Sequence, residues 1–429
     1  RGNWLAAVGM AIAVVATLLT PGMSNWWLIV LGVAIGTAVG VPAARKVKMT
    51  AVPQMVALFN GVGGGAVALI AWVEFRQSDG FGHEPAYVAI ATLFSAVVGS
   101  ISFWGSNVAF GKLQEILPGR PIGIGRLQQP LNALLLLISV TCAVLVLAGN
   151  TSQWWMIALL VASAVLGVTV VLPIGGADMP VVISLLNALT GLSAAAMGLA
   201  LNNTALIVAG MIVGASGTIL TNLMAKAMNR SIPAIVAGGF GGTGGAAAVS
   251  ASGTVRKTSA ADAAIQMAFA NQVIIVPGYG MAVAQAQHAV REMADLLESR
   301  GVPVYYAIHP VAGRMPGHMN VLLAEADVPY ERLKEMEDIN REFTRTDVTM
   351  VIGANDVTNP AARTDPASPI YGMPILNVDH SRSVIVLKRG MATGFAGVDN
   401  ALYFDPKTSM LFGDAKSSVS EVTLELKAL

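Results

Sequence analysis

Long apolar runs fill the first half of this chain. A hydrocarbon core of about 30 Å takes about 20 helical residues to cross, and eight runs reach or approach that length. They cover Leu5–Thr20, Trp26–Val41, Gln54–Val73, Ala86–Phe110, Leu131–Ala148, Trp154–Leu172, Val181–Leu201 and Ala205–Ala225. The first two are short for a span. The pattern predicts an all-α transmembrane helix bundle of about eight spans over residues 1–228.

After residue 228 the pattern changes to short apolar runs that alternate with amphipathic stretches. Val273–Val276 is a continuous β-branched run, which is typical of a buried parallel strand. Helical periodicity follows over Met281–Arg300, and Val302–Ile308 is a second strand. Further strands are expected at Val348–Ile352 and Val384–Leu387. Strands alternating with helices predict an α/β domain over residues 263–429, with a doubly wound parallel sheet of the Rossmann type.

The charged residues mark the same boundary. The chain has 26 Lys and Arg and 25 Asp and Glu, of which only 14 lie in residues 1–228. Its mean hydropathy of +0.64 is too high for a soluble protein of this length. No basic patch with interleaved aromatic residues occurs, which argues against nucleic-acid binding. Cys142 is the only cysteine and no metal-ligand spacing is present, so we expect neither a disulfide within the chain nor a metal site.

Basic residues in the short loops orient the predicted bundle. Nine fall on one side: Arg1, Arg45, Lys46, Lys48, Lys112, Arg120, Arg126, Lys226 and Arg230. Arg76 alone falls on the other side. Because short cytoplasmic loops carry an excess of Lys and Arg, we expect a multi-pass protein of a bacterial cytoplasmic (inner) membrane with its C-terminal domain in the cytoplasm.

The predicted spans are rich in Gly, Ala and Ser. Small residues let helix backbones approach closely in lipid, which accounts for most of these glycines. The alternative is that some of them leave room for water beside a polar side chain. The candidates are Asn60, Asn107, Asn132 and Asn187, since no His, Lys, Arg, Asp or Glu lies deep in any predicted span. Asp178, at the rim before a helix, can be accounted for as an N-terminal cap.

Residues 229–262 connect the two halves. They include a run of Gly, Phe and Thr at 237–245 and a Ser-rich stretch at 250–254. No strand precedes the glycines and no GK[ST] follows, so they are not a phosphate loop. Such a composition is typical of a flexible coil, and we interpret the segment as a hinge.

Candidate chemistry begins directly after the first strand of the second half. Gly278, Tyr279 and Gly280 stand where glycines of a dinucleotide-binding domain let a pyrophosphate reach a helix N-terminus. The same fingerprint includes Ala282 and has Val283 where Gly or Ala is usual, so the motif alone is weak. Its strand, turn and helix context favours a dinucleotide site.

The residues after two other strands bear on which dinucleotide is bound. An NAD site usually has a carboxylate at the end of the second strand, but here that strand is followed by His309 and Pro310. Lys388 and Arg389 directly follow a later strand and could hold the 2′-phosphate of NADP. The alternative is a solvated surface pair. His309 is equally well a hydrogen-bonded residue at a strand end or a part of the site.

Taken together, six segments resemble the β subunit of proton-translocating NAD(P) transhydrogenases, which combines a membrane domain with an NADP(H)-binding domain. They are Ile174–Val182, Ala225–Arg230, Pro277–Gln287, Ile308–Asn320, Gly353–Asp356 and Leu411–Lys416. The resemblance runs nearly end to end. It implies hydride transfer between NAD(H) and NADP(H) coupled to proton movement, with NADP(H) on this chain. The NAD(H)-binding domain of the family has no counterpart here, so the resemblance implies an alpha subunit or subunits that carry it together with further transmembrane helices. It also implies a dimer of the whole assembly.

The resemblance also implies which residues contact NADP(H). They are Tyr279, Val311, Ala312, Gly313, Arg314, Met315, Pro316, Gly353, Ala354, Asn355, Asp356, Val357, Lys388, Arg389, Gly390, Met391, Ala392, Thr393, Gly394, Phe395, Gly413, Asp414, Ala415 and Lys416. Asp356 would lie near the nicotinamide and serve catalysis, with Lys388 and Arg389 at the 2′-phosphate. The family usually has Tyr at the position of Phe395, which puts a hydroxyl contact there in doubt.

A proton route needs a group that can take up a proton, and none of the five histidines lies in a predicted span. Two-chain transhydrogenases have a histidine in the segment that here contains Asn60. We therefore expect a histidine from a partner helix, with Asn60, Asn187 and Ser216 holding water around it; the alternative is that protons move by water alone. The residues assigned to the pathway or its coupling are Asn60, Asp178, Asn187, Gly214, Ser216, Gly217, Lys226 and Arg230. A rival hypothesis is a transporter gated by a dinucleotide-sensing domain.

Overall fold

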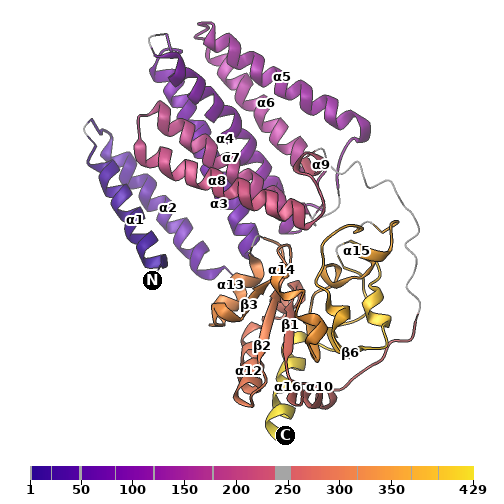
Figure 1. Cartoon of the computed structure of the whole chain (residues 1–429). Coiled ribbons are helices and arrows are strands. Elements are labelled where there is room, and N and C mark those ends of the chain that lie inside the picture. The colour runs from indigo at the N-terminus through magenta and orange to yellow at the C-terminus, as the bar shows by residue number, and fades with distance from the viewer. Residues whose placement is uncertain are drawn as a thin grey trace.

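The computed structural model describes residues 2–20, 22–47, 51–82, 84–118, 121–175, 178–236, 253–315, 317–368, 370–394 and 396–429. Its first half is a bundle of antiparallel helices (Figure 1). These are α1 (Gly2–Leu18), α2 (Trp26–Lys46), α3 (Val52–Gln77), α4 (Ala86–Leu113), α5 (Gln128–Leu147), α6 (Gln153–Val171), α7 (Met179–Ala200) and α8 (Thr204–Ala227). In the described part of the chain, α2 to α8 are long and apolar enough to cross a membrane, and α1 is a shorter apolar helix. The predicted helical membrane bundle is confirmed.

Helix α4 lies at the centre of the bundle and packs against α3, α6 and α7. Close helix approach depends on glycines that face a neighbouring backbone. A Cβ built on Gly210 of α8 would lie 2.6 Å from the carbonyl oxygen of Gly191 on α7, and one on Gly64 of α3 would lie 2.9 Å from that of Gly99 on α4. Real Cβ atoms do not come so close, so these helices touch only because the side chains are absent. At these positions the glycines serve packing.

The second half folds around a six-stranded sheet. Its strands are β1 (Val273–Pro277), β2 (Val304–Ile308), β3 (Leu333–Glu335), β4 (Val348–Ile352), β5 (Ser383–Lys388) and β6 (Thr408–Phe412). All pair in parallel in the order β3-β2-β1-β4-β5-β6, which confirms a doubly wound sheet of the Rossmann type. The chain reverses its direction of progress across the sheet between β1 and β4, where such folds bind ligands at the carboxyl ends of the strands.

Alternate residues of each strand enter two separate cores. Ile275 faces helices α10 (Ala260–Ala268), α12 (Gln287–Ser299), α13 (His318–Glu325) and α16 (Ala415–Ala428), whereas Ile274 faces short helical turns that include α14 (Met336–Ile339). All five residues of β1 and of β4 are buried. A strand covered on both faces is mostly apolar, which explains these runs; the one polar residue among them, Thr349, shares a hydrogen bond with the Ser381 hydroxyl.

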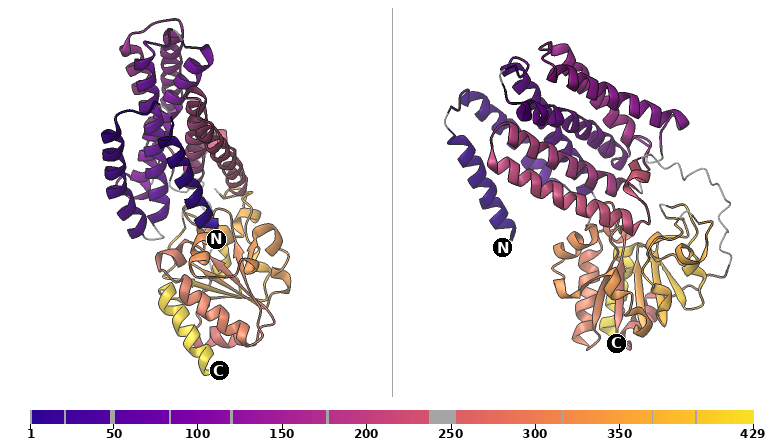
Figure 2. Two further views of the ribbon diagram at one scale, coloured as in Figure 1. Left: turned by 90° about the vertical axis from the view of Figure 1, so that its left-hand side faces the viewer. Right: turned by 45° about the horizontal axis from the view of Figure 1, so that its top comes forward.

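The α/β domain lies at one end of the bundle (Figures 1 and 2). Val311 from the loop after β2 packs against a core cluster of the bundle that includes Leu113, Met179 and Met224. The amide of Asn229, beyond the end of α8, donates a hydrogen bond to the carbonyl oxygen of Tyr371 (3.4 Å). The loops at the carboxyl ends of the strands therefore face the membrane helices.

Two predicted elements differ from the structure. The helix expected over Met281–Arg300 is interrupted, because α11 (Tyr279–Val283) ends before α12 begins. Gln285 has a φ of 52°, and Ala286 N–H and Gln285 N–H donate to the carbonyls of Met281 and Ala282. This is a Schellman ending, with an unusual residue in the left-handed position that glycine normally fills.

The connector predicted at 229–262 is also not all coil where it is described. It contains α9 (Ile232–Val236), and Thr258 N–H donates to the carbonyl of Met410 while Met410 N–H donates to that of Arg256. Helix α10 begins at Ala260, inside the predicted connector. The residues from 255 onward belong to the α/β domain because they pair with β6 and pack on its core. The glycine run at 237–245 and the stretch at 250–252 lie outside the described residues.

Candidate functional site

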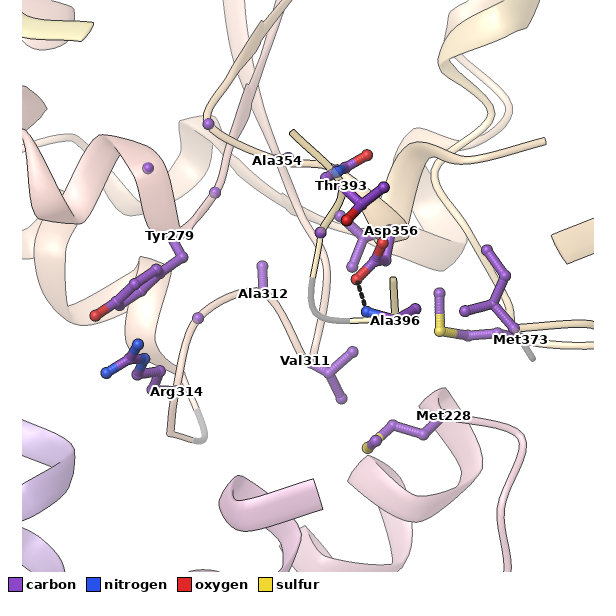
Figure 3. A pocket seen from close by; sticks show the side chains of 18 of the residues that line it. Met228, Tyr279, Val311, Ala312, Arg314, Ala354, Asp356, Met373, Thr393 and Ala396 are labelled. Atoms are coloured by element: carbon purple, nitrogen blue, oxygen red, sulfur yellow. Dashed lines mark hydrogen bonds between the residues drawn. The ribbon is translucent and has the colours of Figure 1, made fainter. Parts of the chain in front are cut away.

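A cleft crosses the carboxyl ends of β1, β4 and β5, and two adjoining cavities occupy it. The larger has a volume of about 460 Å³ and lies between the sheet loops and the end of the bundle (Figure 3). The smaller has a volume of about 240 Å³ and extends toward the end of β6. Gly280, Gly353, Ala354, Asn355 and Lys388 line both cavities. The cleft is therefore one elongated site with two compartments.

The glycines after β1 allow two loops to touch. Gly278 N–H donates to the carbonyl of Ile352 (2.9 Å), and Gly280 N–H donates to that of Gly353 (3.0 Å). A Cβ on Gly278 would lie 2.5 Å from Ala354 Cα, and one on Gly280 would lie 2.7 Å from Gly353 Cα. Gly353 itself has a φ of +68°, a conformation that favours glycine. These contacts bring the first and fourth strand ends together and form the floor of the cleft.

The side chain of Arg314, in the loop after β2, reaches the turn after β1 that contains Tyr279. Its guanidinium carbon lies 4.3 Å from the centre of the Tyr279 ring, and both residues line the larger cavity (Figure 3). Burial raises the pKa of Tyr279, the Arg314 charge lowers it, and Glu115 of the bundle raises it again. Glu115 lies 4.0 Å from Arg314, but its side chain is 81% exposed, so this ion pair between the two domains is weak.

Asp356 follows β4 and anchors the loop after β5. Its Oδ2 accepts a hydrogen bond from Ala396 N–H (3.0 Å), as Figure 3 shows. A Cβ on Gly394 would lie 2.5 Å from Asp356 Oδ1, so the loop can come this close only with glycine at that position. Asp356 thus contacts Gly394 and Ala396, which line the larger cavity with it.

Lys388 and Arg389 lie at the other compartment. The Lys388 ammonium donates to the carbonyl of Ala392 and lies 4.9 Å from the centre of the Tyr403 ring. Burial lowers the pKa of Lys388, whereas Asp356 and Asp399 raise it. Arg389 pairs with Asp414 at 3.2 Å, with both side chains largely exposed. Asp414 also caps α16 by accepting from Lys416 N–H. The basic pair therefore lines the cleft and is not only a solvated surface pair.

For His309 the sequence left two alternatives open, a hydrogen-bonded residue at a strand end or a part of the site, and the structure shows the hydrogen bonds. It is 1% exposed, its Nε2 bonds the carbonyl of Pro374 (2.9 Å), and its Nδ1 accepts from Val311 N–H (3.3 Å). Burial lowers its pKa to about 4, with the Pro374 carbonyl acting in the opposite direction. His309 lines neither cavity of the cleft, and its two hydrogen bonds hold the loop after β2.

The bundle supplies one wall of the larger cavity. Asp178, Met228 and Arg230 line it, and the Asp178 carboxylate pairs with the Arg230 guanidinium. Asp178 stands before α7, but its side chain makes no capping bond there, so the expected cap is wrong. The nearby cation holds the carboxylate toward the cleft instead. Lys112, expected in a loop, lies buried in the last turn of α4 and donates to the carbonyl of Ile174 (2.7 Å) and to that of Leu172.

The polar residues proposed for proton transfer are only partly brought together. Asn60 is buried and donates to the hydroxyls of Ser102 (3.3 Å) and Ser106 (2.9 Å), and Ser102 also bonds Thr190. Ser216 is exposed and bonds the Val213 carbonyl of its own helix. No hydrogen bond within the described residues links Asn60 to Ser216. The other assigned residues are Asn187, half-buried on α7, Lys226, exposed at the end of α8, and Gly214 and Gly217, which face α7.

Most of the residues predicted to contact a dinucleotide line the cleft. They are Gly278, Tyr279, Gly280, Val283, Val311, Ala312, Gly313, Arg314, Gly353, Ala354, Asn355, Asp356, Val357, Lys388, Arg389, Thr393, Gly394, Gly413 and Ala415. Ala282, Met315, Gly390, Met391, Ala392, Asp414 and Lys416 line neither cavity. Pro316 and Phe395 lie outside the described residues. Sequence reasoning missed Ile370, Met373 and Ala396, which lie in loops without any motif, and Met228, which lies in the segment Ala225–Arg230 but was not assigned to the cleft.

This fold and site define a class of protein, in which a helical membrane domain is joined to a Rossmann-type domain with a cation-lined cleft. A family model described as NAD(P) transhydrogenase beta subunit matches residues 1–425. Two relatives named NAD(P) transhydrogenase subunit beta, from Rhodospirillum rubrum and from a particular strain of that species, are each 52% identical over 432 residues, 98% of this chain and 92% of the relative. The chain therefore belongs to the NAD(P) transhydrogenase beta-subunit family. The gated-transporter hypothesis gains no support from these relatives.

Proposed function

We propose that the α/β domain of this chain holds NADP(H), that a partner subunit holds NAD(H), and that hydride passes between them while protons cross the bundle. Family membership makes the chain a subunit of an NAD(P) transhydrogenase, and the name beta subunit implies an alpha partner. The observation that carries the assignment of NADP(H) to this chain is the convergence of five loops, distant in sequence, on one cleft with a cationic lining.

The residues present fit a phosphorylated dinucleotide. The larger cavity, at about 460 Å³, has the size of a small-molecule site, roughly 300–1,000 Å³, and the smaller one of about 240 Å³ extends it. Among the described lining residues the cations are Arg230, Arg314, Lys388 and Arg389, and the carboxylates are Asp178 and Asp356. Asp178 is already paired with Arg230. The pair of Arg389 with Asp414 is exposed and weak, so a 2′-phosphate could replace Asp414 at the guanidinium.

The two compartments suit the two ends of the cofactor. Lys388 and Arg389 in the smaller compartment would bind the 2′-phosphate, and Arg314 would bind the pyrophosphate. Asp356 in the larger compartment would lie near the nicotinamide, which supplies the hydride chemistry when bound. Val311, Met228 and Met373 form apolar wall there, which helps to exclude water. Direct hydride transfer needs orientation and dryness, and needs no protein acid or base.

Proton coupling would act through the shared wall. Asp178 and Arg230 belong to the bundle yet line the cofactor cavity, so a shift of α7 or α8 upon protonation would change that wall. We propose that the hinge region lets the α/β domain move between this position and one that faces the partner. A histidine from a partner helix near the Asn60 network would supply the protonation step, because Asn cannot titrate near neutral pH.

We further propose a bacterial cytoplasmic membrane as the location, with the α/β domain in the cytoplasm and a dimer of the whole assembly. This orientation is supported by the distribution of basic residues, most of which lie at the same end of the bundle as the α/β domain. Lys46, Lys112, Arg126 and Lys226 stand at helix ends on the side of the α/β domain, and Arg76 stands at the far end of α3.

The test compares cofactor affinities of the purified full chain. Wild type should bind NADPH more tightly than NADH. Replacing both Lys388 and Arg389 with Ala should remove most of that preference, since charge-assisted bonds contribute about 1.5–3 kcal/mol each. The matched control replaces Lys334 and Arg345, a basic pair that lines a separate cavity of the same domain. Equal affinity of the wild type for the two cofactors would refute the assignment of NADP(H) to this chain.

A further inference from the structure

Two buried side chains under the cleft bond one residue that lines it. Asn400 caps the start of η8 (Ala401–Phe404), Tyr403 lies within that helix, and each is 2% exposed. Neither lines the two cavities of the cleft, whereas Asn355 lines both. No motif in the sequence marks Asn400 or Tyr403. Their position raises the question of what they do for Asn355.

The hydrogen bonds determine how the amide of Asn355 is turned. Leu402 N–H can only donate, and it donates to Asn400 at 3.0 Å, so that atom of Asn400 is the amide oxygen. The other amide atom of Asn400 is then the NH₂ group, and it lies 3.1 Å from the side chain of Asn355. The Asn355 atom that receives this bond must be its oxygen. The backbone N–H of Leu402 thus determines the orientation of the Asn400 amide, which in turn determines that of the Asn355 amide.

Tyr403 strengthens the same orientation. Its hydroxyl donates to the same Asn355 oxygen at 2.8 Å. Burial raises the pKa of Tyr403, so the hydroxyl stays a donor at neutral pH. With its oxygen held by two donors, Asn355 turns its NH₂ group toward Gly394, where a Cβ would come within 2.9 Å of it. Gly394 lines the larger cavity, so the NH₂ group lies at the cavity wall.

Tyr403 has a second contact with the cleft. The Lys388 ammonium lies 4.9 Å from the centre of its ring, and Lys388 also lines both cavities. A cation over an aromatic face is attracted by the ring quadrupole, more strongly where water is excluded. One buried tyrosine therefore supports two groups of the cleft, one by its hydroxyl and the other by its ring.

We propose that Asn400 and Tyr403 are positioning residues for NADP(H): they hold Asn355 as a hydrogen-bond donor to an acceptor oxygen in the middle of the cofactor, and Tyr403 also places Lys388 for the 2′-phosphate. The middle of a dinucleotide, its pyrophosphate and the flanking riboses, offers acceptor oxygens at the junction of the two compartments. The inference rests on the proposed binding of NADP(H) in this cleft.

The experiment uses the full chain and measures dissociation constants for NADPH and NADH. Tyr403→Phe keeps the ring and removes the hydroxyl, so NADPH should bind about three- to tenfold more weakly with an unchanged preference over NADH. Tyr403→Leu also removes the ring, so the preference itself should fall. Tyr330→Phe is the control, because that tyrosine is 78% exposed and lies outside the cleft.

A second background separates positioning from general stability. In an Asn355→Ala chain, Tyr403→Phe should cause no further loss of NADPH affinity, although it can still lower the melting temperature. Asn400→Asp removes the donor that fixes Asn355 and should weaken NADPH binding as Tyr403→Phe does.

Two results would overturn the inference. One is the same loss from Tyr403→Phe in both backgrounds, and the other is no loss in either. A wild-type chain without any preference for NADPH would instead refute the proposed function, so the two failures can be told apart.

Discussion

The two halves of this molecule bury polar groups in opposite ways. In the bundle, buried polar side chains connect helices to one another, as Asn60 on α3 does with Ser102 and Ser106 on α4. In the α/β domain, the central strands β1 and β4 are apolar apart from Thr349, and the functional polar groups gather at their carboxyl ends. In lipid, helix association depends on small residues and hydrogen bonds; in water, the sheet is stabilised by apolar burial on both faces. Buried polar residues therefore mainly join helices in the first half, apart from Asp178 and Arg230 at the cleft, whereas in the second half they line the ligand site.

The largest effect is expected where a side chain is added at the contact between two membrane helices, because this tests directly whether the bundle depends on close packing. Gly210→Val should abolish the packing of α7 on α8, because even a Cβ would lie 2.6 Å from the Gly191 carbonyl oxygen. We expect a loss of more than about 3 kcal/mol, at the upper end for overpacking. The measurement is the melting temperature and the monodispersity of the full chain in detergent.

Gly36→Val is the matched control for that change. Gly36 also lies in a membrane helix, but a Cβ there meets no atom within 4 Å. The two variants add the same side chain to equally apolar helices. If both destabilise the protein equally, close backbone packing is not the reason for the glycines at the α7–α8 contact.

A smaller effect than that of Gly210→Val is expected from the dependence of the stability of the α/β domain on pH. Burial lowers the pKa of His309 to about 4 from 6.5, so the unfolded chain takes up a proton first as pH falls. The stabilisation is complete above pH 6.5 and is lost progressively down to about pH 4, by up to about 3 kcal/mol. Amide exchange in β1 and β4, followed between pH 7 and 4, measures this loss. His309→Gln should flatten the pH dependence, whereas replacing the exposed His288 should leave it unchanged.

The rim where the halves meet should show coupling between two charges. Asp178→Asn or Arg230→Gln alone leaves one charge without its partner, in a site where the Asp178 side chain is 12% exposed. Each should cost about 1–3 kcal/mol, and the double variant should cost less than the sum of the two. Thermal melts of the four chains in the same detergent give the coupling energy. Strict additivity would mean that the pair contributes nothing as a pair.

The smallest effect is expected at the ion pair between the domains. Glu115 lies 4.0 Å from Arg314 and is largely exposed, so Glu115→Gln should change stability by less than about 0.5 kcal/mol. NADPH affinity should change less than about twofold, which corresponds to a similar energy. A tenfold change would show that Glu115 controls Arg314 more strongly than an exposed carboxylate can.

The sequence predicted best those features that repeat along the chain. The membrane helices, the strands β1, β4 and β5, and the loops after them follow from apolar periodicity and from turn residues at strand ends. Strand ends of a parallel sheet lie at one edge, which is why Gly278, Gly353 and Lys388 could be placed together. The break between α11 and α12 was missed because Gln285 gives no sign of a left-handed conformation.

Contacts between the halves were beyond sequence reasoning. Nothing in the pattern around Met228 or Met373 shows that the end of α8 and the loop after α15 (Ala361–Thr364) enclose the same cavity. Asp178 was read as a helix cap because capping needs only local sequence, whereas its partner Arg230 lies 52 residues away. Asn400 and Tyr403 escaped notice for the same reason, since their bonds to Asn355 span more than 40 residues.

The central claim is that this chain supplies one of two cofactor sites and the partner supplies the other. The most direct measurement is NADH-to-NADP⁺ hydride transfer by the purified full chain in proteoliposomes, alone and with its alpha subunit. The chain alone should bind NADPH and show no turnover, and addition of the alpha subunit should start both transfer and proton movement across the membrane. Steady transfer by the chain alone would contradict the account, because it would require a second dinucleotide site within this sequence.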